Sequence, residues 1–163
     1  MRPAALEQEV AELLLNLGKT IAVAESCTGG LISHRLTNVS GSSAYFEMGL
    51  ITYSNRSKTA MLGVSADLIR SDGAVSEACV RAMASGVRVL AGTDLGLAVS
   101  GIAGPTGGTV EKPVGTVHLA LASPEGVQAW RFLFQGDRES IKGRASDEAL
   151  ARVRDYCRSQ KNG

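Results

Sequence analysis

The chain has 163 residues, of which 44% are hydrophobic and 20% charged, and its formal net charge is +1. This composition supports a folded core and argues against disorder, and the near-zero charge provides no electrostatic drive toward nucleic acid or an anionic membrane. We therefore expect one domain, residues 1–163, with neither nucleic acid nor a membrane as partner.

The cysteines and the first residues indicate a compartment. Cys27, Cys79 and Cys157 lack metal-ligand spacing and leave an odd thiol, which favours a reducing environment over a disulfide framework. Residues 1–9 carry acids where a signal peptide needs an apolar stretch, and no run approaches the roughly 18 apolar residues of a membrane span. We expect a cytoplasmic protein.

Hydrophobic periodicity and glycine stops divide the chain into alternating elements. Leucines recur at helical spacing before Gly18, and Gly63 and Gly92 end two later helical patterns. In chain order the patterns predict a helix over 6–17, a strand over 20–24, a helix over 31–37, a strand over 45–53, helices over 54–62, 65–70 and 76–91, a strand over 95–100, a hairpin of 114–122 and 127–134, and a last helix after Asp137.

Two of these helices have a well-defined apolar face that we expect to be buried. In the helix that starts at Ser76 it comprises Val80, Met83, Val87 and Leu90. In the last helix it comprises Ile141, Ala145, Ala149, Val153 and Tyr156. Helices that precede, separate and follow about five strands predict a three-layer α/β/α sandwich, with a mixed, mostly parallel central sheet of about five strands.

Residues 23–30, Val-Ala-Glu-Ser-Cys-Thr-Gly-Gly, place polar side chains where a strand turns into a helix. Ser26, Cys27 and Thr28 are candidate nucleophiles or anion ligands there, although an ordinary capped helix start fits the same residues. Glu25 could orient a lysine or ribose hydroxyls, or it could be a solvated acid at the strand end. Adjacent strand residues point to opposite sides, so Ser26 and Cys27 are alternatives for one role.

Three loops are rich in small residues: 25–30, 40–43 and 100–113. Such loops let a ligand reach backbone N–H groups, which suits a phosphate or a developing oxyanion, although each loop alone could be a simple turn. His34 and His118 are isolated and lie outside these loops, which disfavours a metal centre and a Ser-His-Asp triad.

Lysine then remains as the available base. Lys58 directly follows the strand that ends at Tyr53, and Lys112 lies inside the third loop. A lysine acts as a base only if burial or a nearby cation lowers its pKa toward neutrality. On spacing alone, an exposed helical lysine is the simpler interpretation of Lys58.

Several blocks appear in a specific order, and together they resemble the CinA C-terminal domain, the nicotinamide mononucleotide deamidase family. The blocks are residues 23–30, Gly41-Ser-Ser-Ala-Tyr, Gly49-Leu-Ile-Thr-Tyr-Ser-Asn, Lys58, Gly73-Ala-Val-Ser-Glu, Ser100-Gly-Ile-Ala-Gly-Pro and Lys112-Pro-Val-Gly-Thr-Val. The resemblance runs from about residue 5 to residue 156, and the chain looks like the stand-alone form of the family.

The resemblance implies hydrolysis of the amide of nicotinamide mononucleotide, a small-molecule substrate, to nicotinate mononucleotide and ammonia, in pyridine nucleotide recycling and without a cofactor. It assigns a serine nucleophile to Ser26, a lysine base to Lys58 and an assisting tyrosine to Tyr53. The residues that it places at the substrate are Thr28, Gly29, Gly30, Ser42, Ser43, Gly101, Gly104, Thr106, Lys112 and Arg138. Thr106 stands where some relatives have aspartate.

Two alternatives remain open. Cys27 could be the nucleophile, because cysteine is intrinsically more reactive than serine. The domain could also be a non-catalytic nucleotide-binding sensor, or a partner module linked to competence or the DNA damage response. In either case we expect a homo-oligomer, and the composition of loop 101–113 would allow it to close over a substrate.

Overall fold

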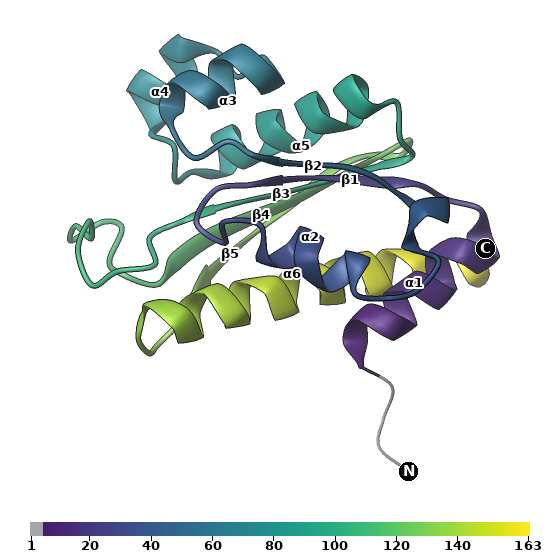
Figure 1. The fold of residues 1–163 in the computed structure, drawn as a ribbon. Coiled ribbons are helices and arrows are strands. Elements are labelled where there is room, and N and C mark those ends of the chain that lie inside the picture. Colours follow the sequence, from purple (N-terminus) through teal and green to yellow (C-terminus); the bar gives the residue numbers. More distant parts are fainter. Residues whose placement is uncertain (1–4) are drawn as a thin grey trace.

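A five-stranded mixed sheet forms the centre of the computed structural model, which describes residues 5–163 (Figure 1). Its strands are β1 (Ile21–Glu25), β2 (Phe46–Ile51), β3 (Leu95–Gly101), β4 (Thr116–Ser123) and β5 (Gly126–Leu133), in the spatial order β2-β1-β3-β4-β5. The first four residues, on which the argument against a signal peptide partly rests, lie outside the described part of the chain.

The expectation of a mostly parallel sheet was wrong. β1 pairs in parallel with β2 and β3, whereas the pairs β3–β4 and β4–β5 are antiparallel. The chain returns from β3 to its neighbour β4 through a loop, and β4 returns to β5 through a tight turn. Neither connection contains the crossover helix that usually links parallel neighbours.

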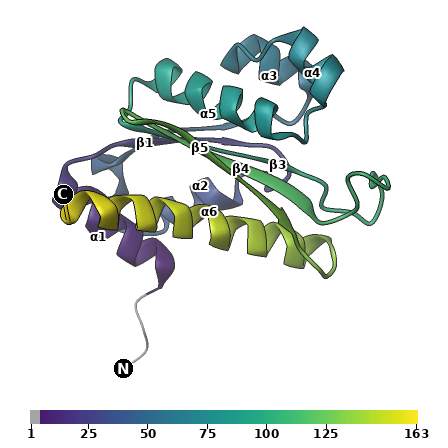
Figure 2. The ribbon, with the colours of Figure 1, turned by 180° about the vertical axis from the view of Figure 1, so that it is seen from behind.

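Helices cover both faces of the sheet, as the two opposite views show (Figures 1 and 2). On one face lie α3 (Asn55–Leu62), α4 (Ala66–Asp72) and α5 (Glu77–Ala91). On the other face lie α1 (Leu6–Leu17), α2 (Leu31–Thr37) and α6 (Arg138–Lys161). No helix among residues 5–163 combines the length and the apolar character that crossing a membrane requires.

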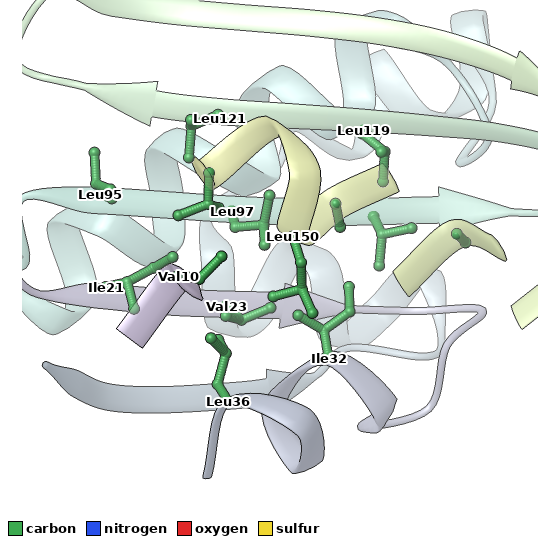
Figure 3. Close-up of a cluster of buried hydrophobic side chains, with 14 of the residues drawn as sticks. Val10, Ile21, Val23, Ile32, Leu36, Leu95, Leu97, Leu119, Leu121 and Leu150 are labelled. Atoms are coloured by element: carbon green, nitrogen blue, oxygen red, sulfur yellow. The ribbon is translucent and has the colours of Figure 1, made fainter. Parts of the chain in front are cut away.

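The larger hydrophobic core fills the space between the sheet and α1, α2 and α6 (Figure 3). Val23 of β1, Leu97 of β3 and Leu150 of α6 are fully buried there. Burying a side chain of this size contributes about 1.5–3 kcal/mol to stability. The core therefore fixes β1 and β3, two of the three parallel strands whose carboxyl ends carry the candidate site.

The opposite face of the sheet is lined mainly by alanines, including Ala22, Ala24 and Ala98, and α5 packs against them. Small side chains let the helix lie close to the sheet. At Gly96, an added Cβ would collide with the carbonyl oxygen of Ala84 in α5, so only glycine permits this approach.

The apolar faces predicted for the two long helices are buried except at their last positions. Val80, Met83 and Val87 are fully buried in α5, but Leu90 is 48% exposed because Ala91 takes the inward position. The same shift occurs in α6. Tyr156 is only half-buried, and Cys157, four residues after Val153, occupies the core.

Candidate active site

A pocket of about 270 Å³ lies beyond the carboxyl ends of the parallel strands. Glu25, the last residue of β1, pairs with Ile51 of β2 and Val99 of β3, so the segments that follow β1, β2 and β3 leave the sheet at the same edge. Ser26 and Lys58 line this pocket together with residues 100–104, Thr106 and Gly107. Such a crevice at the carboxyl ends of strands is the usual place for a site in an open α/β sheet.

Two residues from different elements meet in the pocket. The amine Nζ of Lys58 lies 3.1 Å from Oγ of Ser26, within hydrogen-bond distance. Lys58 is only 1% exposed and Ser26 8%. The interpretation of Lys58 as an exposed helical lysine was therefore wrong.

A well-capped helix holds Lys58 in place. The Ser54 hydroxyl accepts a hydrogen bond from the Ser57 N–H, and the Ser57 hydroxyl accepts one from the Ser54 N–H. This reciprocal capping box fixes the start of α3 directly after β2 and satisfies N–H groups that the helix leaves unpaired. Lys58 follows one turn later and points back toward the sheet edge.

The surroundings of the Lys58 amine favour its neutral form. Burial lowers the pKa of Lys58 below its ordinary value, and no carboxylate among residues 5–163 forms an ion pair with it. Nζ donates to the carbonyl oxygens of Thr52 at 2.7 Å and Tyr53 at 3.3 Å. A neutral amine has two N–H groups and one lone pair, so with both N–H groups on these carbonyls the lone pair can accept the proton of the Ser26 hydroxyl.

Tyr53 contributes to the site through two different groups. Its backbone carbonyl receives Lys58, while its phenol accepts a hydrogen bond from Nη2 of Arg138 at 3.0 Å. Nη1 of the same guanidinium donates to the Gly104 carbonyl at 2.7 Å. Arg138 thus joins the β2–α3 connection to the glycine-rich loop. In this arrangement the Tyr53 phenol makes no hydrogen bond to Ser26 or Lys58.

Glu25 is neither solvated nor bonded to Lys58. It is completely buried, and its carboxylate accepts hydrogen bonds from the Thr28 hydroxyl, the Ile32 N–H, and the N–H and hydroxyl of Ser33. The carboxylate therefore caps the start of α2 and fixes the turn that carries Ser26. Thr28 is also buried, and its hydroxyl is committed to Glu25.

Cys27 lies beside Ser26 and also lines the pocket, but it is buried and belongs to the larger hydrophobic core together with Val23 and Val99. Burial raises the pKa of its thiol to about 12, so the reactive thiolate is strongly disfavoured. An added Cβ at Gly101 would lie 3.1 Å from the Cys27 sulfur and 2.8 Å from Val117. The close packing of this region requires glycine at position 101.

The glycines of the first turn shape the backbone next to Ser26. Gly29 and Gly30 have φ values of 61° and 105°, a region that side chains rarely adopt. The Gly29 N–H donates to the Ser26 carbonyl, whereas within the described chain the Cys27 and Thr28 N–H groups make no backbone hydrogen bond. These two backbone N–H groups next to Ser26 are candidate donors to a ligand or an oxyanion.

The structure brings only some of the expected substrate residues to the pocket. Gly101, Gly104, Thr106 and Arg138 line it. Ser42 and Ser43 lie in a short 3-10 turn (Ser42–Ala44) before β2, at the opposite end of that strand from Tyr53. Lys112 lies in the glycine-rich loop, which projects beyond the sheet (Figure 1), and its amine donates to the Asp72 carbonyl at 2.8 Å.

Other groups around the pocket were not expected from the sequence. The Thr52 carbonyl is the nearest acceptor to Lys58, and Asn55 and Ser100 line the pocket. Ser100 belongs to the loop 100–113 that the sequence identified as a whole, although Ser100 was not named individually. Nothing in the sequence distinguishes a backbone carbonyl such as that of Thr52. Throughout residues 5–163, no group of three or more histidine, cysteine or carboxylate side chains is placed to hold a metal ion.

Comparison with known proteins gives consistent matches over nearly the whole chain. The pattern of the CinA C-terminal domain matches residues 3–157. A CinA-like protein of Syntrophotalea carbinolica is 53% identical over 153 residues, which are 93% of this chain and 37% of that protein. Another, from Citrifermentans bemidjiense, is also 53% identical and matches 96% of this chain. The chain thus spans little more than a third of the length of these curated relatives.

Solved structures agree with these sequence matches. A competence-damaged protein (CinA) superfamily protein from Klebsiella pneumoniae is 36% identical with a TM-score of 0.91, and the match covers 94% of this chain and 96% of that one. A competence/damage inducible protein from Agrobacterium tumefaciens is 36% identical with a TM-score of 0.82, covering 99% and 97%.

Proposed function

The chain belongs to the CinA C-terminal domain family, and on that premise we propose that it hydrolyses the carboxamide of nicotinamide mononucleotide to nicotinate mononucleotide and ammonia. One observation supports this activity above the others. A buried lysine amine, held by two backbone carbonyls, lies 3.1 Å from a serine hydroxyl in a pocket. This is the arrangement that an amidase with a serine nucleophile and a lysine base needs.

In the proposed reaction, Ser26 Oγ attacks the carboxamide carbon while neutral Lys58 takes the hydroxyl proton. The tetrahedral intermediate collapses, the C–N bond breaks, and Lys58 returns the proton to the nitrogen, which leaves as ammonia. Water then attacks the resulting ester, with Lys58 again accepting a proton. Breakage of the ester bond releases nicotinate mononucleotide and restores the Ser26 hydroxyl.

Backbone groups are suited to stabilise the intermediate. The N–H groups of Cys27 and Thr28 adjoin the nucleophile, and each such donor is worth about 3 kcal/mol in enzymes with an oxyanion hole. The pyridinium ring of the substrate withdraws electrons and makes the amide carbon more electrophilic. We propose that Tyr53 assists by holding Lys58 through its carbonyl and by relaying a proton when its phenol leaves Arg138.

Ser42 and Ser43 are a separate matter, because they lie at the far end of β2 from the pocket. We propose that the chain forms a homo-oligomer, and these serines would contact a substrate only if they come from a second copy. Light scattering would give the oligomeric state, and a Ser42→Ala variant would show whether the turn affects KM.

A second function is a nucleotide-binding sensor or a partner module. The names of the relatives refer to competence and damage, although those names describe those proteins. Ammonia release separates the two functions. We expect purified protein to release ammonia from nicotinamide mononucleotide faster than from free nicotinamide or the dinucleotide. Tight nucleotide binding without ammonia would favour the sensor.

A further inference from the structure

Residues 102–115 form a loop whose two ends are fastened to each other. The Gly115 N–H donates to the Ile102 carbonyl at 2.8 Å, and the Ile102 N–H donates to the Thr116 carbonyl at 2.9 Å. Between these ends the loop supplies part of the pocket wall, Gly104 included. Paired ends alone do not order the middle of a loop, so other contacts have to keep this wall in place.

The side chain of Lys112 fastens the far part of the loop to a different element. Residues 105–111 are exposed throughout, whereas Lys112 is half-buried and its amine donates to the Asp72 carbonyl at 2.8 Å. Asp72 is the last residue of α4, where a helix leaves its carbonyls unpaired and favours a positive charge. The amine also lies 3.0 Å from the position that a Cβ on Gly73 would occupy, so it contacts the turn that ends α4.

Two other side chains reach the loop, and they come from different directions. Arg138 of α6 donates to the Gly104 carbonyl at 2.7 Å, and Arg131 of β5 donates to the Glu111 carbonyl at 3.2 Å. Each guanidinium holds one carbonyl of the loop. The Lys112 amine supplies a third attachment, from the loop to α4.

The connection between α4 and α5 also belongs to the pocket. Ala74 and Val75 in this connection line it, and the Ser100 hydroxyl donates to the Ala74 carbonyl at 2.8 Å. Lys112 therefore joins two segments that line the same pocket. Neither Lys112 nor Asp72 is among the described residues that line the pocket, so the contact between them acts from outside it.

We propose that Lys112 is a positioning residue, which fastens the glycine-rich loop to the end of α4 and thereby fixes the pocket wall for the substrate. This inference rests on the proposed amidase function. The wall bears on the chemistry because the Gly104 carbonyl holds Arg138, which in turn reaches the Tyr53 phenol. A loosened loop would bind the substrate less well and orient it less accurately toward Ser26.

The test compares Lys112→Met with Lys112→Arg and with the matched control Lys161→Met, which makes the same change at the exposed last residue of α6. We expect Lys112→Met to lower kcat/KM for nicotinamide mononucleotide about tenfold, through both a higher KM and a lower kcat. Lys112→Arg keeps a cationic N–H donor for the Asp72 carbonyl and should recover most of this loss. The control should behave as the wild type.

Amide hydrogen exchange reports the loop directly. In Lys112→Met, exchange should become faster within residues 102–115, including Thr109, whose N–H donates to the Lys112 carbonyl at 2.8 Å. Exchange in the buried strands β1 and β3 should stay as in the wild type, because the substitution lies outside the core. Lys112→Arg should restore the slower exchange of the loop.

Three results would overturn the proposal. Faster loop exchange with wild-type kinetics would mean that the attachment has no role in the reaction. A raised KM with unchanged kcat and unchanged loop exchange would make Lys112 a direct ligand of the substrate. Wild-type exchange together with wild-type kinetics would leave the contact without any effect.

The two proposals can fail separately. If the wild type releases no ammonia, the amidase function fails. Calorimetry with nicotinamide mononucleotide and the exchange rates of residues 102–115 then still decide the role of Lys112. We expect Lys112→Met to weaken binding of the mononucleotide and Lys112→Arg to recover it. Equal affinities for wild type and Lys112→Met would overturn the positioning role.

Discussion

The amine of Lys58 lies 3.1 Å from the hydroxyl of Ser26, although 32 positions separate the two residues in the chain. β1 and β2 run in parallel and end at the same edge, so the residue after one strand meets the helix that follows the other. The contact is buried, and the nearest acceptors to the amine are backbone carbonyls rather than carboxylates.

Ser26→Ala is expected to abolish ammonia release, lowering kcat by roughly 10³-fold or more, because the nucleophile is lost. Cys27→Ala should retain most of kcat, since the Cys27 side chain packs in the core and its thiol has a raised pKa. Removing a buried sulfur should lower the free energy of unfolding by about 1 kcal/mol, so the thermal unfolding of both variants should be measured alongside the assay as a control. The reverse order of activities would make Cys27 the nucleophile.

The activity should rise with pH as Lys58 loses its proton. Only the neutral amine can accept a proton from Ser26, and burial lowers the pKa of Lys58 below its ordinary 10.5, so kcat/KM should increase and then level off below that pH. Measurements above pH 7 avoid titration of the substrate phosphate, whose second pKa is about 6. Lys58→Arg should be inactive across the range, because arginine does not deprotonate. Activity retained in Lys58→Arg, or a kcat/KM that falls as the pH rises above 7, would speak against Lys58 as the base.

Tyr53→Phe tests the proposed relay. The variant keeps the backbone carbonyl that receives Lys58 and removes only the phenol oxygen that accepts from Arg138. If the phenol relays a proton, kcat should fall by about 10²-fold, a typical loss for a general acid–base group. The lost contact to Arg138 should also raise KM a few-fold. An unchanged kcat with a raised KM would confine Tyr53 to positioning Arg138.

The sequence predicted best those features that depend on local pattern. The predicted helices 6–17 and 31–37 have the same bounds as α1 and α2, because the apolar residues and the flanking glycines that define each helix are close together in the sequence. Leu90 and Tyr156 are more exposed than predicted. Because a helix has 3.6 residues per turn, the inward position near the end of each helix falls one residue later, on Ala91 and Cys157.

Features that depend on distant contacts were harder to predict. The sequence predicted a connection without a helix after β3 and the hairpin that follows it, but it did not show that β4 pairs with β3 and so makes this pair antiparallel. Residues 40–43 and 100–113 are both rich in small residues, yet only the second segment reaches the pocket. The first segment precedes β2 and lies at its amino end, whereas the second begins at the carboxyl end of β3. Glu25 can be fully buried because its carboxylate accepts hydrogen bonds from donors up to eight residues away on α2.

Gly86 provides a test of how the fold positions Lys58. It lies in α5 where that helix crosses the end of α3, and an added Cβ would collide with the backbone carbonyl of Leu62. Gly86→Ala should therefore push α3 away, cost about 1–3 kcal/mol in the free energy of unfolding, and lower kcat through the displaced Lys58 amine. Denaturant unfolding and steady-state kinetics measure both effects.

Gly143→Ala is the matched control, since it makes the same change inside a helix where an added Cβ meets nothing within 4 Å. There the better helix propensity of alanine should stabilise the protein by about 0.5–1 kcal/mol and leave kcat unchanged. A Gly86→Ala variant that behaves like this control would mean that the close approach of α5 to α3 does not determine where Lys58 lies. Loss of kcat with unchanged stability would mean that the contact with Leu62 positions Lys58 without contributing to stability.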